Sequence, residues 1–191
     1  MSDLLIAAPV ALEARMISAG RPPAWVRRTG MGPRRSRAAV PALLEDPGEA
    51  LLVMGFGGGL ARDSQVGDVV VAEEVRGPGG ERVACAGTQR LAEALDACGL
   101  RVRCGTVLSV TRVAIGKTRA RLGETGALAV DMESVWLAPG AGERPFAVVR
   151  VLSDTPTREL TRPLLTVAGF ARASMTLRRV ATALHDWTPG E

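Results

Sequence analysis

The feature of this sequence that most constrains its fold is a series of short apolar runs with helical stretches between them. The runs are rich in Val, Leu and Ala and lie at Leu4–Ala8, Leu51–Met54, Val69–Ala72, Val102–Val110, Leu128–Val130 and Phe146–Leu152. Runs of this length, bounded by turn residues, are typical of buried strands. The spacing of apolar residues predicts helices at Arg34–Leu44, Gln89–Cys98, Met132–Ala138 and Gly169–Leu184.

Strands that alternate with helices predict a three-layer α/β/α sandwich around a central mixed, mostly parallel sheet. Ligands of such sheets bind beyond the carboxyl ends of the strands. The 191 residues fit one compact domain, and no internal repeat or long linker interrupts them. We therefore expect a single domain over residues 1–191, with residues 185–191 as a flexible tail and Gly77–Gly80 as a tight loop.

Composition narrows the class of protein. Hydrophobic residues make up 47% of the chain and charged residues 23%, a balance typical of globular proteins. Aromatic residues make up 3%, and Tyr is absent, so a stacking platform for single-stranded nucleic acid has little to be built from. The formal charge of +4 comes almost wholly from Arg and decides little about partners. We expect no nucleic-acid partner.

Cysteine and histidine exclude several kinds of site. Cys85, Cys98 and Cys104 show no CxxC spacing, so neither a disulfide framework nor a zinc site is indicated. His185, the single histidine, lies in the terminal segment, which argues against a Ser/His/Asp site or a multi-histidine metal site. The apolar run Leu4–Leu12 is too short to span a bilayer and poorly flanked for a signal peptide. A cytoplasmic protein without a metal or a cofactor is the expectation.

Two glycine-rich segments are candidates for close backbone approach to a ligand. The run Gly55–Leu60 follows a predicted strand, where backbone N–H groups could turn toward an anion or a sugar oxygen. It is not a dinucleotide fingerprint, because Leu60 stands at the third glycine position. The pair Gly30 and Gly32 precedes a predicted helix. A plain turn explains either segment equally well.

The segment Ala114–Thr118 is similar to the end of a phosphate-binding P-loop. A P-loop needs a glycine five residues before Gly116, where this chain has Thr111. Without that glycine the loop cannot wrap a triphosphate in the usual way. A P-loop nucleotidase is therefore a distant alternative.

Three acidic residues are candidates for chemistry, and each has a plainer explanation. Glu133 follows a predicted strand and could accept hydrogen bonds from two ribose hydroxyls, or simply stand in the first turn of a helix. Asp154, in Ser153-Asp154-Thr155-Pro156, could act as an acid or as a helix N-cap. Glu13 lies in an apolar neighbourhood that could raise its pKa toward that of a general base, although an exposed helix glutamate is commoner.

The order of these segments is more specific than any one of them. The candidate segments follow one another along the chain in this order: Glu13, a Gly-x-Gly turn, Gly55–Leu60, Val66–Val71, Val130–Ser134 and Val149–Asp154. This series resembles the purine nucleoside phosphorylase and methylthioadenosine nucleosidase superfamily, from near the first residues to about Asp154. The resemblance implies an enzyme that breaks the N-glycosidic bond of a purine nucleoside and forms a homo-oligomer, a dimer or larger.

The resemblance also implies roles for individual residues. Glu133 would bind the ribose hydroxyls, Met132 would line the sugar, Asp154 would protonate the purine N7 and Glu13 would activate water. Further substrate contacts are expected from Ser153, Val113, Ala114 and Met31. The pocket for water, or for phosphate as an alternative co-substrate, is expected at Phe56, Gly57, Gly58, Gly30 and Gly32. Arg34 and Arg35 are the residues that favour phosphate.

Departures from the family pattern concern the substrate. Phe56 replaces a small or hydroxyl residue, and Val113 with Ala114 stands near the place of an aromatic that stacks on the base. Asp131 replaces the commoner Glu. The segment between Ala72 and Leu91 is short, which leaves the 5′ side of the sugar open to a large substituent. Residues that could contact such an apolar tail, or simply pack in the core, are Met31, Trp25 and Trp136.

The chain is similar to the hopanoid-pathway branch, which removes adenine from adenosylhopane, and a lipid substrate of that kind would bring peripheral membrane contact. A carboxylic acid suits the 6-amino group of adenine, so an adenosine derivative with a bulky or apolar 5′ group is the favoured substrate. A nucleosidase for methylthioadenosine or adenosylhomocysteine is the first alternative. A non-catalytic purine-binding module of the same fold is the second.

Overall fold

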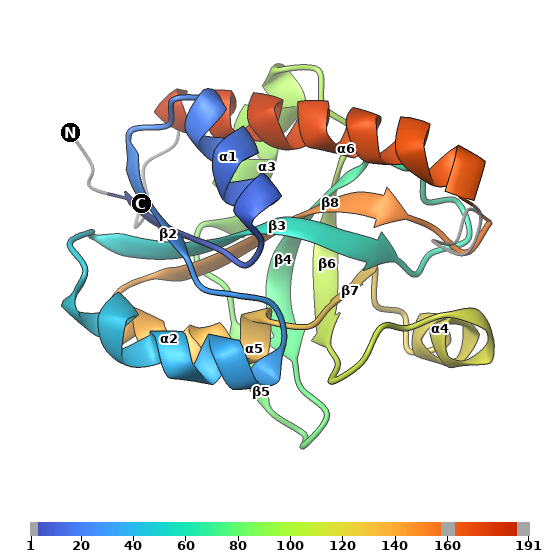
Figure 1. The fold of residues 1–191 in the computed structure, drawn as a ribbon, viewed down its shortest axis with the longest axis horizontal. Helices are drawn as coiled ribbons and strands as arrows, with labels where there is room; N and C mark the ends of the chain where they lie inside the picture. Colours follow the sequence, from blue (N-terminus) through green and yellow to red (C-terminus); the bar gives the residue numbers. More distant parts are fainter. Residues whose placement is uncertain (1–3, 158–162, 187–191) are drawn as a thin grey trace.

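In the computed structural model, which describes residues 4–157 and 163–186, helices cover both faces of a mixed eight-stranded sheet (Figure 1). The strands are β1 (Leu4–Ala8), β2 (Ala24–Arg28), β3 (Ala50–Gly59), β4 (Val69–Arg76), β5 (Arg82–Ala84), β6 (Val102–Ser109), β7 (Ala129–Asp131) and β8 (Phe146–Asp154). Five of the eight strand pairings are parallel. The predicted three-layer fold with a mixed, mostly parallel sheet is confirmed.

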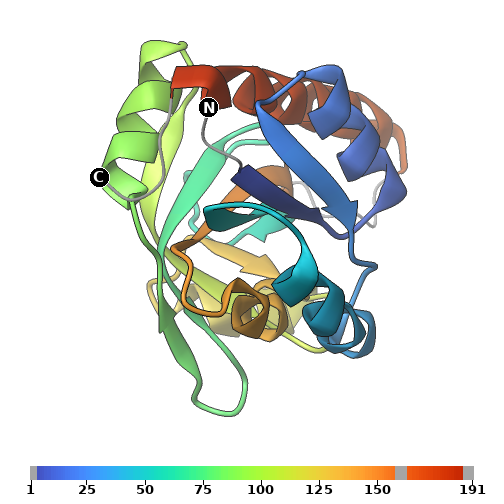
Figure 2. The ribbon, with the colours of Figure 1, turned by 90° about the vertical axis from the view of Figure 1, so that its left-hand side faces the viewer.

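The helices form two layers. They are α1 (Ala11–Ala19), α2 (Pro33–Glu45), α3 (Thr88–Ala97), α4 (Gly116–Gly123), α5 (Ser134–Leu137) and α6 (Pro163–Ala183), with 3-10 turns at Ala138–Ala141 and Leu184–Asp186. Helices α1, α3 and α6 cover one face of the sheet, and α2 with α5 covers the other (Figure 1). Viewed from the side, the strands curl between these two layers (Figure 2).

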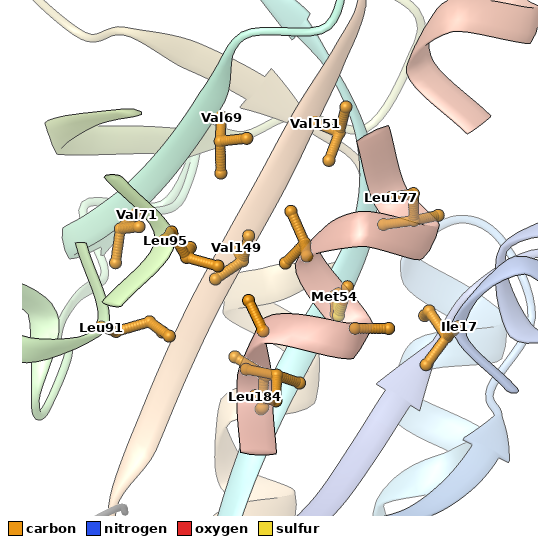
Figure 3. Packing of buried hydrophobic residues seen from close by; sticks show 14 of the residues in the cluster. Ile17, Met54, Val69, Val71, Leu91, Leu95, Val149, Val151, Leu177 and Leu184 are labelled. Carbon is orange, nitrogen blue, oxygen red and sulfur yellow. The ribbon is translucent and has the colours of Figure 1, made fainter. Parts of the chain in front are cut away.

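Both faces of the central strands are buried, as their uninterrupted apolar runs predict. Along β1, Leu4 and Ile6 join the core under α1, α3 and α6, whereas Leu5 and Ala7 join the core on the opposite face. In the first of these cores, side chains of α3 and α6 pack over those of β4 and β8 (Figure 3). Alternate residues of one strand therefore stabilise two separate layers.

The sheet closes on itself at one end. β8 pairs with both β3 and β4, β4 pairs with β6, and β6 pairs with β7. β7 then pairs antiparallel with the end of β3, where Gly58 lies opposite Val130. Five strands thus form a ring, a closure that the sequence does not reveal. It brings Asp131 of β7, Asp154 of β8 and the glycines of β3 to the same end of the sheet.

Several sequence-based boundaries need correction. The glycine run Gly55–Gly59 is not a turn but the second half of β3: residues 55–58 pair with β8, with a shift of register between Gly57 and Gly58, and Gly59 pairs with Ala129 of β7. β2 and β5 escape prediction because β2 is a polar edge strand and β5 has three residues in a hairpin with β4. The tight loop at Gly77–Gly80 is confirmed: it closes that hairpin, with the Gly77 amide donating to the Glu81 carbonyl at 2.9 Å.

The C-terminal tail expected at residues 185–191 falls mostly beyond the described chain. His185 and Asp186 complete a 3-10 turn, and residues 187–191 lie outside the described residues. His185 Nε2 lies 2.7 Å from the carbonyl oxygen of Arg21. Within residues 4–157 and 163–186, no helix is both long and apolar enough to cross a membrane.

Candidate active site

A cavity of about 200 Å³ opens at the closed end of the sheet. Eleven of the thirteen residues that the sequence predicts for the site line it: Glu13, Met31, Phe56, Gly57, Gly58, Val113, Ala114, Met132, Glu133, Ser153 and Asp154. Gly30 and Gly32 do not. Gly30 lines an adjoining cavity with Arg28 and Arg35, and the Gly32 amide donates to Glu133 Oε1 at 3.0 Å. The two glycines therefore lie beside this cavity and not in its wall, and their contact with water or phosphate stays a prediction.

Glu13 lies in the first turn of α1 and turns inward rather than to solvent, with 3% of its surface exposed. Its two carboxyl oxygens accept hydrogen bonds from the amides of Val10 and Phe56, both at 2.6 Å. Burial raises the pKa of Glu13 to about 7, although Arg150 and the two amides oppose that rise. The side chain is therefore fixed in position and able to exchange a proton near neutral pH.

Two more carboxylates, those of Asp131 and Glu133, lie around the buried Arg150. Asp131 Oδ2 accepts from Arg150 Nε at 2.9 Å, and Asp131 Oδ1 accepts from the amides of Glu133 and Ser134 at 3.1 and 3.2 Å. Arg150 Nη2 lies 3.7 Å from Glu133 Oε2. Burial raises the pKa of Glu133 and Arg150 opposes this. The network orients Glu133 at the wall of the cavity, where sugar hydroxyls could donate to it.

Asp154 is the last residue of β8, and α6 begins nine residues later at Pro163, so Asp154 is not the cap of a helix. The side chain is buried and forms an ion pair with Arg119 of α4. Arg119 is 3% exposed and also donates through Nε to the carbonyl oxygen of Ala114 at 3.0 Å. Both charged groups line the cavity beside Val113 and Ala114. The resemblance places the purine base at this end of the cavity, which thus holds the Arg119 cation as well as the Asp154 carboxylate.

The glycine run of β3 makes room for these charges. A Cβ atom on Gly55 would lie 2.5 Å from Glu13 Oε1 and 2.9 Å from Arg150 Nη1. On Gly58 it would lie 3.0 Å from Arg119 Nη2 and 3.2 Å from Asp154 Oδ1. The glycines are therefore needed for close approach of charged side chains to a strand, and not for a turn around an anion.

Apolar side chains form the rest of the wall. The ring of Phe56 packs against that of Phe170 in α6, with centroids 4.8 Å apart. Met31 and Val113 stand at the rim and are 53% and 57% exposed. Trp25 lines a different cavity on β2, and Trp136 is buried in the core under α2. Of the three residues considered for contacts with an apolar tail, only Met31 lies at the site.

The sequence family described as the phosphorylase superfamily matches residues 8–185. The chain belongs to this superfamily. The match spans Glu13, the glycine strand, Glu133 and Asp154, as the sequence resemblance predicts. No curated protein matches the chain by sequence.

Solved structures share the fold of this superfamily member at low identity. The 5′-methylthioadenosine/S-adenosylhomocysteine nucleosidase of Helicobacter pylori superposes with a TM-score of 0.82 at 15% identity, covering 97% of this chain and 98% of that one. The futalosine hydrolase of Helicobacter pylori gives 0.81 at 16%, covering 97% of each chain. The S-adenosylhomocysteine nucleosidase of Streptococcus pyogenes gives 0.74 at 19%, covering 96% and 97%. At these identities the likeness establishes the fold.

Among the cavity residues of this superfamily member that sequence reasoning did not assign to the site are Arg119 and Phe170. Arg119 lies in a helix whose neighbours are Lys117, Thr118 and Arg121, so its charge predicts an exposed position. Phe170 lies 157 positions after Glu13 and no pattern links the two. Only the fold places both beside the cavity.

The cavity is not assembled like a metal centre or a P-loop. Among residues 4–157 and 163–186, no group of three or more His, Cys, Asp or Glu side chains could hold a metal ion. The segment that is similar to the end of a P-loop forms the start of α4, and this helix carries Arg119 toward Asp154.

Proposed function

We propose that this protein hydrolyses the C1′–N9 bond of a purine nucleoside, with Glu13 as the base that activates water. The observation that carries the proposal is the placement of a buried carboxyl group, with its pKa raised to about 7, in the same cavity as Glu133 and Asp154. Breaking a glycosidic bond needs a nucleophile on one side of the sugar carbon and a stabilised leaving group on the other. The three acids can divide these tasks.

Glu13 and Asp154 lie at different points along β3. Glu13 lies against Gly55 and Asp154 lies against Gly58, three residues further along β3. Strand geometry separates those two glycines by roughly 10 Å. Glu133 reaches the cavity from the end of β7, where it could accept hydrogen bonds from the sugar hydroxyls. A sugar held there would present one face to Glu13 and its base toward Asp154.

Asp154 faces the leaving group. The purine takes the electron pair of the broken bond, so protonation or a charged contact on the base must stabilise it. General acid help of this kind contributes on the order of 10²–10⁴-fold. The resemblance assigns that proton transfer to Asp154, and its burial at the base end of the cavity supports the assignment.

Water is favoured over phosphate as the nucleophile. Among the described residues that line the cavity, Arg119 carries the positive charge, and it lies at Asp154 rather than at Glu13. Arg35 lines the adjoining cavity. The amide of Phe56, at the start of the predicted phosphate pocket, already donates to Glu13. A phosphate dianion at this point would meet a carboxylate, whereas a water molecule could donate its proton to it.

The 5′ side of the substrate lies toward an apolar rim. Met31 and Val10 line the cavity and are exposed, and Phe170, which packs against Phe56, lines it as well. Structures of the same fold come from nucleosidases for 5′-methylthioadenosine and S-adenosylhomocysteine and from a futalosine hydrolase. These names support a nucleoside with a 5′ substituent as the substrate class. Adenosylhopane stays a prediction, and the apolar rim is the feature that favours it.

The test is release of free purine from 5′-substituted purine nucleosides, measured by chromatography. We expect release by the wild type, and a loss of about 10²-fold or more in Asp154→Asn, as for removal of a general acid. An exposed acid on α3, altered in Asp96→Asn, serves as the matched control and should retain activity. Binding without turnover in the wild type would instead support the non-catalytic purine-binding module.

A further inference from the structure

Apolar side chains are exposed around the mouth of the cavity. Val10, Met31 and Val113 come from three separate segments of the chain, and all three line the cavity. Their exposed fractions are 37%, 53% and 57%, and Ile115, two residues after Val113, is 44% exposed. Single exposed apolar residues are common on protein surfaces. A group of them around one opening instead marks a surface that contacts a ligand, a protein or a membrane.

The charged residues of these segments are all basic. Residues 9–12, 28–35 and 110–118 contain five basic residues and no acid. All five are exposed, and they are Arg28, Arg34, Arg35, Arg112 and Lys117. Among residues 4–157 and 163–186 none of the five takes part in an ion pair, whereas Arg27, Arg76 and Arg103 each pair with an acid. We call the four apolar and five basic side chains the rim patch.

The rim patch complements the surface of a membrane that contains acidic lipids. Acidic headgroups attract exposed arginine and lysine, and exposed apolar side chains gain by entering the boundary between headgroups and acyl chains. The acids that line the cavity, by contrast, are at most 5% exposed. Attraction to acidic lipids therefore meets no exposed acid in these three segments.

A second copy of this chain fits the rim patch less well. In the commonest symmetric dimer the same surface of each copy meets itself, which here would set unpaired cations against unpaired cations. Like charges that face each other across an interface are unfavourable. A membrane has no such constraint, because its acidic lipids supply the opposite charge.

We propose that the rim patch docks the protein on an anionic membrane surface, with the opening of the cavity turned toward the lipid. This inference goes beyond the proposed hydrolysis. A purine nucleoside that is anchored by an apolar 5′ substituent can then reach Glu13 and Glu133 while its tail remains in the bilayer. Met31 and Val113 stand between the two environments, since they line the cavity and are also exposed.

The experiment measures co-sedimentation of the full chain with lipid vesicles. One set of vesicles contains equal parts of phosphatidylglycerol and phosphatidylcholine, and the other contains phosphatidylcholine alone. We expect the wild type to bind the acidic vesicles at least about 10-fold more tightly than the neutral ones, because each cation near an acidic surface adds to the attraction. The binding should weaken as the salt concentration rises, since salt screens exposed charges.

Variants at the rim patch identify the surface that docks. Arg112→Gln combined with Lys117→Gln removes two cations that do not line the cavity. Each basic residue near an acidic membrane strengthens binding about 5-fold, so the double variant should bind about 30-fold more weakly. Ile115→Ser removes an exposed apolar side chain and should weaken binding by about 3- to 10-fold. These variants should still cleave a soluble 5′-methylthio purine nucleoside at the wild-type rate, because the altered residues lie outside the cavity wall.

The matched control removes two exposed arginines of α6, in Arg178→Gln combined with Arg179→Gln, and should bind the acidic vesicles like the wild type. Helix α6 covers the face of the sheet opposite to α2 (Figure 1). An equal loss in the two double variants would overturn the inference, because it would assign the binding to net charge and not to the rim patch.

Two further results would overturn the inference. One is a wild type that binds neither kind of vesicle, or both kinds equally. The other is a rim variant that binds vesicles normally but changes the mass of the protein in solution, which would assign the patch to contact between copies of this chain. Vesicle binding is measured without substrate, so a failure of the proposed hydrolysis would leave this test intact.

Discussion

Arg150 and Asp131 form an ion pair in which neither side chain is exposed, with Arg150 Nη2 lying 2.8 Å from Asp131 Oδ2. The same guanidinium lies close to Glu133 and to the carbonyl oxygen of Phe56. Burial opposes the charge of Arg150, but Asp131, Glu133 and Glu13 together raise its pKa above the ordinary value. Arg150 thus links Asp131 and Glu133 to β3, where the amide of Phe56 donates to Glu13.

Removing one partner of this pair should destabilise the protein strongly. In Asp131→Asn the buried Arg150 loses its closest countercharge, and breaking a buried pair in this way costs about 3–5 kcal/mol. Urea unfolding would measure the loss. Asp63→Asn, which breaks an exposed pair with Arg103, is the control and should shift the unfolding midpoint little. Equal shifts in the two variants would contradict the structural role of Asp131.

Activity should depend on the ionisation of Glu13. A base must be deprotonated to take a proton from water, and the pKa of Glu13 is raised to about 7 because the side chain is buried. We therefore expect kcat/KM to rise with pH through about 7 and then level off. Glu13→Gln should lower it by about 10²–10⁴-fold, while the exposed change Glu49→Gln should not. A rise with the same midpoint in Glu13→Gln would assign that ionisation to another group.

The same ionisation predicts a pH dependence of stability. Glu13 has an ordinary pKa of 4.5, which is raised to about 7 in the folded protein. Its contribution is fully present below pH 4.5 and is lost as the pH rises through about 7, because the folded state binds more protons in that window. The free energy of unfolding should fall there by about 3 kcal/mol from this group. Denaturant titrations at several pH values should show the fall in the wild type and its absence in Glu13→Gln.

Gly55 should be intolerant of any side chain. A Cβ atom there would lie 2.5 Å from Glu13 Oε1, so Gly55→Ala must displace the carboxyl group or the strand. We expect loss of most purine release together with reduced thermal stability. Gly169→Ala is the matched control, since its nearest contact would be an ordinary 3.4 Å to Val66 and it lies within α6. That variant should be active, and inactivity of both would show a general intolerance of the fold.

Buried strands and the acids that follow them were within reach of sequence reasoning. The apolar runs of β1, β4 and β8 predict strands with both faces covered. Asp154 and Glu133 lie at or just after the ends of predicted strands. The sequence predicts a turn at the glycine run of β3 because glycine has low strand propensity. Glycine is needed in this strand because of tertiary contacts: Glu13 and Arg150 occupy the space that a side chain on Gly55 would need.

The burial of Arg119 is a feature of the site that the sequence does not predict. A charged helix such as α4 predicts a solvated face, and nothing in its local sequence distinguishes the buried Arg119 from the exposed Arg121. The difference arises because the ring of strands carries Asp154 to a point that α4 covers. Ion pairs between segments far apart in the sequence depend on the topology of the fold, so the local sequence pattern cannot predict them.

The most direct measurement is cleavage of a 5′-methylthio purine nucleoside in ¹⁸O-labelled water, with and without phosphate. Hydrolysis at this cavity predicts that the label enters the sugar product at C1′, that phosphate leaves the rate unchanged, and that Glu13→Gln loses incorporation and release of the base together. A phosphate-dependent reaction that yields an unlabelled sugar 1-phosphate would contradict the assignment of water as the nucleophile. Absence of any released base would contradict the proposed function itself.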